Sequence, residues 1–163
     1  MSAPAGSDFV LRPPVPGDFG WIIHRQATLY TAEYGWDGSF EILIAGLIAK
    51  FDPLREQAWI AERNGRIAGS IFLMRGDEPE TAKLRLLYVE PDARGCGIGQ
   101  ALVDVCVERA RAMGYRRVTL WTNDVLTAAR KIYERSGFLR IAAEPHHAFG
   151  HDLVSETWLR DLD

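Results

Sequence analysis

A glycine-rich turn is the segment of this sequence best suited to holding a ligand. Residues 94–99 read Arg-Gly-Cys-Gly-Ile-Gly, between a strand-like run and a run with helical spacing. Glycines let the backbone turn sharply and come close to a ligand. The unpaired amides at the start of a helix, together with the helix dipole, attract anions. With the fixed positive charge of Arg94, the segment predicts a site for a pyrophosphate.

Two common phosphate-binding motifs do not fit this turn. The Walker motif requires Gly-Lys-Ser/Thr, but Gly99 is followed by Gln100 and Ala101. The dinucleotide fingerprint needs its third glycine three residues after the second, and neither Gly97 nor Gly99 has one there. The pattern that does fit is Arg-x-x-Gly-x-Gly, formed by Arg94, Gly97 and Gly99.

The chain around the turn divides into short elements that would have to position it. Strands are predicted at 9–12, 59–63, 66–73, 82–89, 118–122, 138–142 and 153–159, and helices at 19–34, 39–51, 99–113 and 126–136. Asn64-Gly65 between two strand-like runs indicates a tight hairpin. The order β-α-α-β-β-β-α-β-α-β-β predicts an α/β or α+β fold. In it, an antiparallel meander runs into a βαβ unit, and helices cover both faces of the mixed sheet.

Composition is that of an ordinary globular protein. The 163 residues are 47% hydrophobic and 25% charged, which predicts a single domain over residues 1–163 with a flexible tail at 1–8. The net charge of −3 argues against a general nucleic-acid binder. Cys96 and Cys106 make no disulfide framework, so we expect reduced thiols in a cytoplasmic protein. We expect no membrane span, because no apolar run approaches about 20 residues. We also expect no signal peptide, because the first residues have no basic start followed by an apolar run.

With this turn and this order of elements, the sequence resembles the GNAT superfamily of N-acetyltransferases. Residues 87–101 are similar to the family's acetyl-CoA motif, and residues 129–138, with their Tyr-x-x-x-Gly-Phe, resemble the helix and strand that follow. In element order the resemblance spans residues 9–159. More narrowly, residues 82–138 and the ending 144–147 resemble the acetyltransferase domain that some bacterial regulators carry behind a MarR-type DNA-binding domain. From the length of 163 residues we expect this chain to lack that DNA-binding half.

The resemblance implies acetyl-CoA as co-substrate and no metal. The strand around Tyr88 would splay from the strand at 118–122, and its open edge would pair with pantetheine. The amide of Leu87 or Val89 would hold the thioester carbonyl, where negative charge develops during acyl transfer. The implied cofactor contacts are Leu87, Tyr88, Val89, Arg94, Gly95, Cys96, Gly97, Ile98, Gly99, Gln100 and Asn123.

The resemblance also implies that Tyr133 is the general acid that protonates the departing thiolate. The alternative is that Tyr133 is a core aromatic residue on an amphipathic helix. The identity of the general base is left undecided by the resemblance, because Lys83 and Trp121 stand where members of the family carry glutamates. The remaining candidates are Glu33, Glu80, His146 and His147; otherwise the amine loses its proton to water.

The acceptor side of the site is predicted from two regions. Lys83, Arg85, Leu87 and Val89 should alternate onto one face of their strand, opposite Leu84, Leu86 and Tyr88. Two cations on the face that carries the acetyl group indicate a pocket for a carboxylate, unless they merely extend into solvent. Substrate contacts are also expected from Glu33, His146 and above all Trp36, which follows Gly35 in a loop and is hard to assign to the core.

Together these features predict an N-acetyltransferase in which the primary amine of a small molecule attacks acetyl-CoA directly. The hypothesis for the acceptor is an amino-acid-like compound that bears a carboxylate. The alternative is an acyl-CoA-binding sensor with little turnover, and a longer acyl donor stays open. Tyr133 favours the enzyme, since a sensor needs no acid for a leaving group. A homodimer is a further possibility for the assembly.

Overall fold

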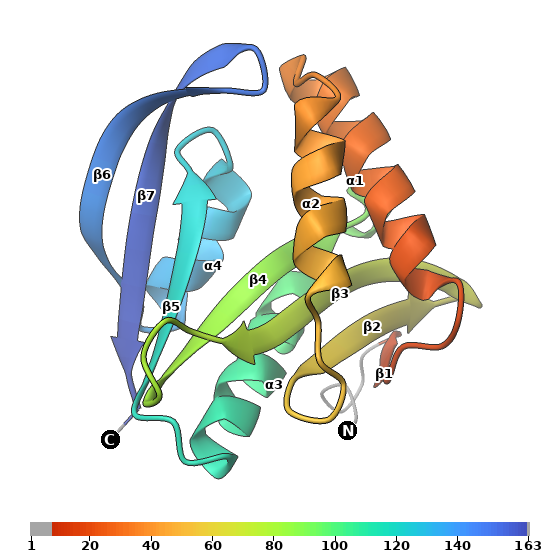
Figure 1. The fold of residues 1–163 in the computed structure, drawn as a ribbon. Helices are drawn as coiled ribbons and strands as arrows, with labels where there is room; N and C mark the ends of the chain where they lie inside the picture. The colour runs from red at the N-terminus through yellow and green to blue at the C-terminus, as the bar shows by residue number, and fades with distance from the viewer. Residues whose placement is uncertain (1–7, 163) are drawn as a thin grey trace.

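The computed structural model describes residues 8–162, which form a seven-stranded mixed sheet with helices on both faces (Figure 1). Residues 1–7 of the predicted tail lie outside the described residues. The strands are β1 Val10–Arg12, β2 Gln57–Arg63, β3 Arg66–Arg75, β4 Thr81–Val89, β5 Arg117–Asn123, β6 Leu139–Ala148 and β7 His151–Asp161. The helices are α1 Asp18–Tyr34, α2 Ser39–Ala49, α3 Ile98–Ala112 and α4 Thr127–Arg135, with a 3₁₀ turn, η1, at Pro91–Ala93.

The predicted order of elements is confirmed, and so is the mixed sheet. The strands lie in the order β1-β2-β3-β4-β5-β7-β6, and every neighbouring pair is antiparallel except β4 and β5. Asn64 and Gly65 close the β2–β3 hairpin with φ of 53° and 74°, the positive values that this tight turn requires. Helix α3 connects β4 to β5 and completes the βαβ unit (Figure 1).

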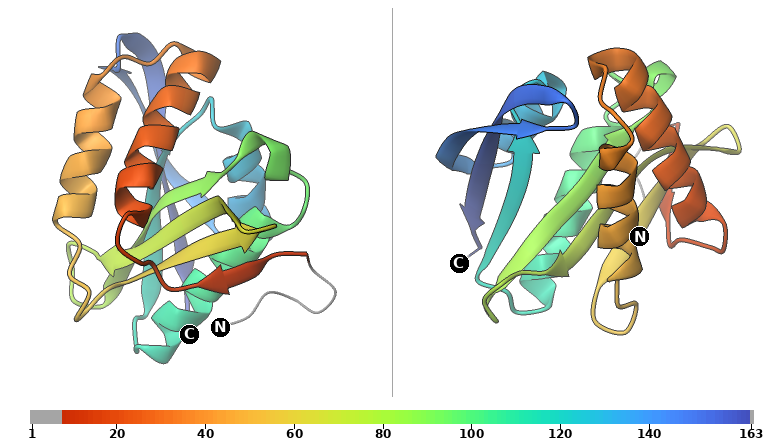
Figure 2. Two further views of the ribbon diagram at one scale, coloured as in Figure 1. Left: turned by 90° about the vertical axis from the view of Figure 1, so that its right-hand side faces the viewer. Right: turned by 45° about the horizontal axis from the view of Figure 1, so that its top comes forward.

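The helices divide between the two faces of the sheet. Helices α1 and α2 cover one face and α3 covers the other, as both views of Figure 2 show. Helix α3 buries Leu102, Cys106 and Ala110 along one stripe, because residues three or four apart share a helix face. The core is therefore two apolar layers with the sheet between them.

The parallel pair in the middle of the sheet is incomplete. Strands β4 and β5 pair only at Thr81, Ala82 and Lys83, and beyond that point they diverge (Figures 1 and 2). A β-bulge accompanies the divergence, since the register between β3 and β4 shifts where Leu86 takes a φ of 56°. An extra residue in one strand bends that strand and increases its twist. The bulge thus turns the second half of β4 away from β5.

The bulge also corrects the predicted alternation of β4. Lys83 and Arg85 face α1 and α2 as expected, but Leu86 packs on that side as well, against Phe72 and its neighbours. Leu87 and Val89 pack instead on the α3 side. The prediction that Leu87 and Val89 share a face with the two cations was wrong, because the extra residue reverses the faces after Leu86.

Gly69 lies where β3, β4 and α3 come closest together, and its replacement tests this packing. A Cβ there would stand 2.6 Å from the carbonyl oxygen of Tyr88 and 3.2 Å from Ile98 Cγ2. We predict that Gly69→Ala lowers the free energy of unfolding by about 1–3 kcal/mol, because the backbone oxygen must shift. Gly46→Ala, in the exposed part of α2 with nothing within 4 Å, should raise it by about 0.5–1 kcal/mol. Urea unfolding of both variants checks this; equal effects would contradict it.

Candidate active site

A cavity of about 340 Å³ lies where β4 and β5 diverge. Strands β4 and β5 and helix α4 border it, as do α1, the α1–α2 loop, α2 and the turn between β6 and β7; Lys83 and Arg85 of β4 face α1 and α2 at what we call the acceptor end. Its walls are formed by Gln26, Tyr30, Trp36, Phe40, Leu43, Ile44, Leu47, Lys83, Leu84, Arg85, Leu86, Leu87, Trp121, Thr122, Asn123, Leu126, Tyr133 and Phe149. The volume lies at the lower end of the range of roughly 300–1,000 Å³ that is typical of small-molecule sites.

The backbone of β4 presents free amides to this divergence. The N–H of Glu90 donates to the carbonyl oxygen of Ala68 in β3, at 2.8 Å. Because successive amides of a strand point to opposite edges, those of Leu87 and Val89 point away from β3. On that side β5 is paired no further than Lys83. The edge is therefore open to a ligand with its own amide groups. The side chain of Tyr88 points to α1 instead, where its hydroxyl donates to Glu90.

The glycines of the predicted turn have two different roles. Gly95 and Gly97 have φ of 83° and 86°, which other residues rarely adopt, and a Cβ on either would meet nothing within 4 Å. Gly97 is the N-cap of α3 and no side chain caps the helix there. Gly99 differs: a Cβ on it would stand 2.6 Å from Ile132 Cδ1 of α4. The first two shape an open anion site, and the third lets α4 pack closely on α3.

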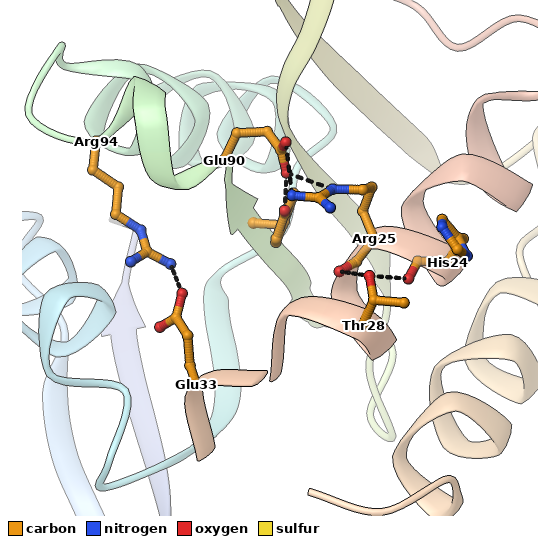
Figure 3. Close-up of polar contacts among 7 residues, drawn as sticks. His24, Arg25, Thr28, Glu33, Glu90 and Arg94 are labelled. Carbon is orange, nitrogen blue, oxygen red and sulfur yellow. Dashed lines mark hydrogen bonds and ion pairs between the residues drawn. The ribbon is translucent and has the colours of Figure 1, made fainter. Parts of the chain in front are cut away.

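The remaining residues of the turn are anchored to the rest of the fold. Arg94 donates from Nη2 to Glu33 Oε1 of α1 at 2.8 Å, as Figure 3 shows. Nearby, Arg25 of α1 donates to both carboxylate oxygens of Glu90, at 3.1 and 3.0 Å (Figure 3). Cys96 is partly buried against the core. Two ion pairs thus fasten α1 to the end of β4 and to the turn.

Gln100 and Ile98 look inward from the start of α3. The side-chain amide of Gln100 donates to Asp104 and to Ser136, both at 2.9 Å, so it ties α3 to the end of α4. Ile98 is buried in the core. The Ile98 side chain thus packs in the core, and the Gln100 side chain joins two helices by hydrogen bonds.

Tyr133 lies on α4 at the wall of the cavity and is only 5% exposed. Its ring packs 6.0 Å from that of Phe138 and 6.2 Å from that of Trp158, measured between centroids. Burial raises the pKa of the phenol above its ordinary value. The hydroxyl therefore keeps its proton at neutral pH. Tyr133 is both a core aromatic residue and a protonated donor beside the cavity.

A buried carboxylate holds the helix that carries Tyr133. Glu156 of β7, only 2% exposed, lies 3.0 Å from Arg130 Nε of α4 and 3.1 Å from Arg140 Nη1 of β6. The indole N–H of Trp158 donates to it as well, at 3.1 Å. Arg130 is three residues before Tyr133, so this network fixes the turn of α4 from which the phenol projects.

The four base candidates lie in different surroundings. His146 Nε2–H donates to Oδ1 of the buried Asn123 at 2.8 Å, and its ring meets Trp121 edge-on. His147 pairs with Asp152 on the surface, at 2.9 Å. Glu33 holds Arg94. Glu80 precedes β4, at the end where β4 and β5 are still paired. His146 thus contacts two residues of the cavity wall, Trp121 and Asn123.

The expected acceptor contacts are placed as follows. Lys83 and Arg85 both line the cavity, but Lys83 also lies 3.5 Å from the exposed Asp77. Arg85 is half-buried and makes no hydrogen bond or close ion pair with any residue between 8 and 162, although the charges of Asp77 and Glu56 act on it. Burial lowers the pKa of its guanidinium from the ordinary value. Trp36 lines the cavity too, yet it is only 2% exposed, so the expectation that it lies outside the core was wrong.

Gln26 and Phe149 are two of the cavity-wall residues that were not anticipated from the sequence. Gln26 is a buried polar side chain in the middle of α1. Phe149 forms the turn between β6 and β7 with a φ of 56°, and its ring centroid lies 4.7 Å from that of Trp36. Asp37 N–H donates to the Phe149 carbonyl at 3.1 Å, which joins this turn to the α1–α2 loop.

Between residues 8 and 162, no three His, Cys, Asp or Glu side chains gather in a way that could hold a metal ion. In the same part of the chain, no helix is long and apolar enough to cross a membrane.

Comparison with known sequences gives one family and several partial relatives. The model of the acetyltransferase (GNAT) family matches residues 23–138. Mycothiol acetyltransferase of Geodermatophilus obscurus is 45% identical over 71 residues, 42% of this chain and 23% of that protein. N-acetylaspartate synthetase of Xenopus tropicalis is 33% identical over 89 residues, 55% of this chain and 33% of that protein. An uncharacterized N-acetyltransferase of Escherichia coli is 34% identical over 85 residues, 51% of either chain. The chain thus spans about half or less of these relatives.

Solved structures share the fold over nearly the whole chain. A GNAT-family acetyltransferase of Staphylococcus aureus superposes with a TM-score of 0.78 at 20% identity, over 95% of this chain and 99% of that one. A putative acetyltransferase of Salmonella typhimurium, solved with its cofactor acetyl-CoA, superposes with a TM-score of 0.74 at 22% identity. The superposition covers 96% of this chain and 95% of that one. At these identities the likeness concerns the fold alone, and the fold implied by the sequence resemblance is confirmed.

The Glu156 network provides a stability test. We predict that Glu156→Ala lowers the free energy of unfolding by about 3 kcal/mol, because it leaves two arginines beside a buried position without their partner. The control is Glu108→Ala, which removes a surface partner of Arg111 on α3 and should cost no more than about 0.5 kcal/mol. Denaturant titration measures both. A cost for Glu156→Ala as small as the control's would show that the network does not hold α4.

Proposed function

The chain belongs to the acetyltransferase (GNAT) family, and from that premise we propose that it transfers the acetyl group of acetyl-CoA to the primary amine of a small molecule that carries a carboxylate. The observation that supports this most is the open edge of β4, where the amides of Leu87 and Val89 face a cavity instead of a strand. Relatives named as acetyltransferases support the same chemistry.

The residues along the divergence fit acetyl-CoA. Pantetheine would pair its amides with the open edge of β4, and its pyrophosphate would lie over the uncapped start of α3 at Gly97. Arg94 would add a charge-assisted hydrogen bond there. Because Arg94 is paired with Glu33 in this structure, binding the pyrophosphate would exchange one anion for another.

The proposed chemistry is direct attack without a covalent enzyme intermediate. As the amine nitrogen bonds to the thioester carbon, the N–H of Leu87 or Val89 donates to the carbonyl oxygen, where negative charge develops. When the carbon–sulfur bond breaks, the Tyr133 hydroxyl gives its proton to the sulfur. The amine must lose a proton, and water or His146 receives it.

The acceptor end of the cavity supports a carboxylate on the substrate. Arg85 is half-buried in a mostly apolar wall and makes no hydrogen bond or close ion pair among residues 8–162, although the charges of Asp77 and Glu56 act on it. No carboxylate lies close enough to hydrogen-bond its guanidinium, so an anionic ligand would stabilise this half-buried charge further. Lys83 contributes less in this proposal, because it forms an ion pair with Asp77 at 3.5 Å, whereas Arg85 feels Asp77 only at a longer distance.

Several finer expectations stay predictions. They are the likeness to acetyltransferase domains fused to MarR-type regulators, a cytoplasmic location and a homodimer. A longer acyl donor is a variant of the same proposal, and the first experiment below includes it.

Tyr133→Phe tests the proposed acid. We predict a kcat about 10²–10⁴-fold lower with little change in affinity for acetyl-CoA, because the variant keeps the ring and loses only the proton donor. The measurement is release of free thiol from acetyl-CoA and longer acyl-CoAs across a panel of amines. Since burial raises the pKa of Tyr133, the wild-type rate should not fall through loss of its proton below about pH 10. Tight acyl-CoA binding with no turnover on any amine would favour the sensor instead.

Arg85→Ala tests the acceptor carboxylate. We predict that KM for carboxylate-bearing amines rises about 10–100-fold, while KM for acetyl-CoA stays unchanged, because a charge-assisted bond is lost only on the acceptor side. Lys83→Ala is the matched control and should change KM by less than threefold, given its exposed partner Asp77. An unchanged KM in Arg85→Ala would remove the carboxylate from the proposal.

A further inference from the structure

An unpaired amide lies in the wall of the cavity, at the acceptor end. The side chain of Gln26 is only 2% exposed, and its Nε2 has no hydrogen-bond partner in the described part of the chain. Buried amide donors are nearly always paired, because a buried donor that makes no hydrogen bond lowers the stability of the fold. Gln26 also borders the cavity. A donor that is buried, unpaired and placed at a cavity is suited to bind an oxygen atom of a ligand.

The wall around Gln26 is aromatic. Tyr30, Trp36, Phe40 and Phe149 contact one another with ring centroids 4.7–5.4 Å apart, and Ile44 completes the same apolar cluster. Leu43 and Leu47 extend the wall along α2. These rings come from α1, the α1–α2 loop, α2 and the β6–β7 turn. An acceptor that enters this end of the cavity meets a large apolar surface.

The structure holds Phe149 in this wall against its own backbone preference. A φ of 56° is uncommon for a residue other than glycine, and such strain persists where the surrounding structure enforces it. The Asp37 amide donates to the Phe149 carbonyl, and His151 Nε2–H donates to the Gly35 carbonyl at 2.9 Å. Both bonds join the β6–β7 turn to the α1–α2 loop. The apolar end of the cavity is thus closed by two segments that lie more than 100 residues apart in the chain.

Three chemical features therefore meet in one cavity: the half-buried Arg85 guanidinium, which makes no hydrogen bond, the unpaired Gln26 amide and an apolar wall. We propose that the acceptor is a free amino acid with a large branched or aromatic side chain. Its carboxylate binds Arg85, one of its oxygens accepts from Gln26 Nε2, and its side chain lies against the aromatic wall. This inference rests on the proposed function and names the substrate class of that site. The small volume of the cavity favours a single amino acid over a peptide.

The affinity of wild type for a set of amino acids tests the class. The full chain, saturated with CoA, is titrated by calorimetry with L-leucine, L-phenylalanine, L-alanine, L-aspartate and phenethylamine. We expect leucine or phenylalanine to bind at least about 100-fold more tightly than alanine, since each methylene in an apolar pocket discriminates about 10-fold or more. Aspartate should bind weakly because it has no apolar group, and phenethylamine because it has no carboxylate. Equal binding of leucine, alanine and aspartate would overturn the substrate class.

Gln26→Leu tests the amide. It should weaken binding of the preferred amino acid about tenfold or more and leave affinity for CoA unchanged. Because the donor is unpaired in the free protein, the variant should keep or raise the melting temperature, whereas loss of a purely structural bond would lower it. Gln57→Leu is the matched control, at the start of β2 and outside the cavity wall, and should bind like wild type. Unchanged affinity for the amino acid in Gln26→Leu would overturn the role of Gln26, and a lower melting temperature beside it would show that the amide is purely structural.

Thiol release from acetyl-CoA, measured with the same amino acids, separates this inference from the proposed function. Binding in the expected order without thiol release would support the substrate class and contradict catalysis. Thiol release with small or polar amines, together with no preference for large apolar amino acids, would support catalysis and overturn the substrate class.

Discussion

The rest of the structure depends on the place where β4 and β5 stop pairing. A parallel pair inside a sheet normally satisfies its backbone groups along its whole length. Here the pairing ends at Lys83, and the bulge at Leu86 bends β4 away from β5. The result is a cavity in the middle of the sheet and amides at Leu87 and Val89 that no strand receives. A gap of this kind persists because the outer neighbours hold the two strands: β3 pairs with β4 on both sides of the bulge, and β7 pairs with β5 from Arg117 to Asn123.

Helix α1 connects the two ends of this gap. Its ion pairs with Glu90 and with Arg94 reach the cofactor side of the proposed site (Figure 3), while Gln26 and Tyr30 line the acceptor side. On the opposite side, close packing at Gly99 and the buried Glu156 set the position of α4 and hence of Tyr133. Donor, acid and acceptor are thus positioned by elements that all border one defect in the sheet.

The order of elements followed from local signals in the sequence, whereas the details of the site depended on distant contacts. Asn64-Gly65 and Gly35 predicted a hairpin and a helix end because their positive φ is a local requirement. The bulge at Leu86 left no trace, since apolar residues continue through it on both faces. The burial of Trp36 depends on Phe149, from a turn more than 100 residues away. Gln26, by contrast, could have been found: it lies four residues from both Ile22 and Tyr30, a polar residue on an apolar stripe.

The claim that the open edge of β4 receives the donor is tested most directly by amide hydrogen exchange. The full chain is compared by NMR with and without saturating acetyl-CoA, residue by residue. The account predicts slower exchange at Leu87 and Val89 and at the first amides of α3, with little change along β6. Slower exchange confined to other parts of the chain, with Leu87 and Val89 as fast as in the free protein, would contradict it.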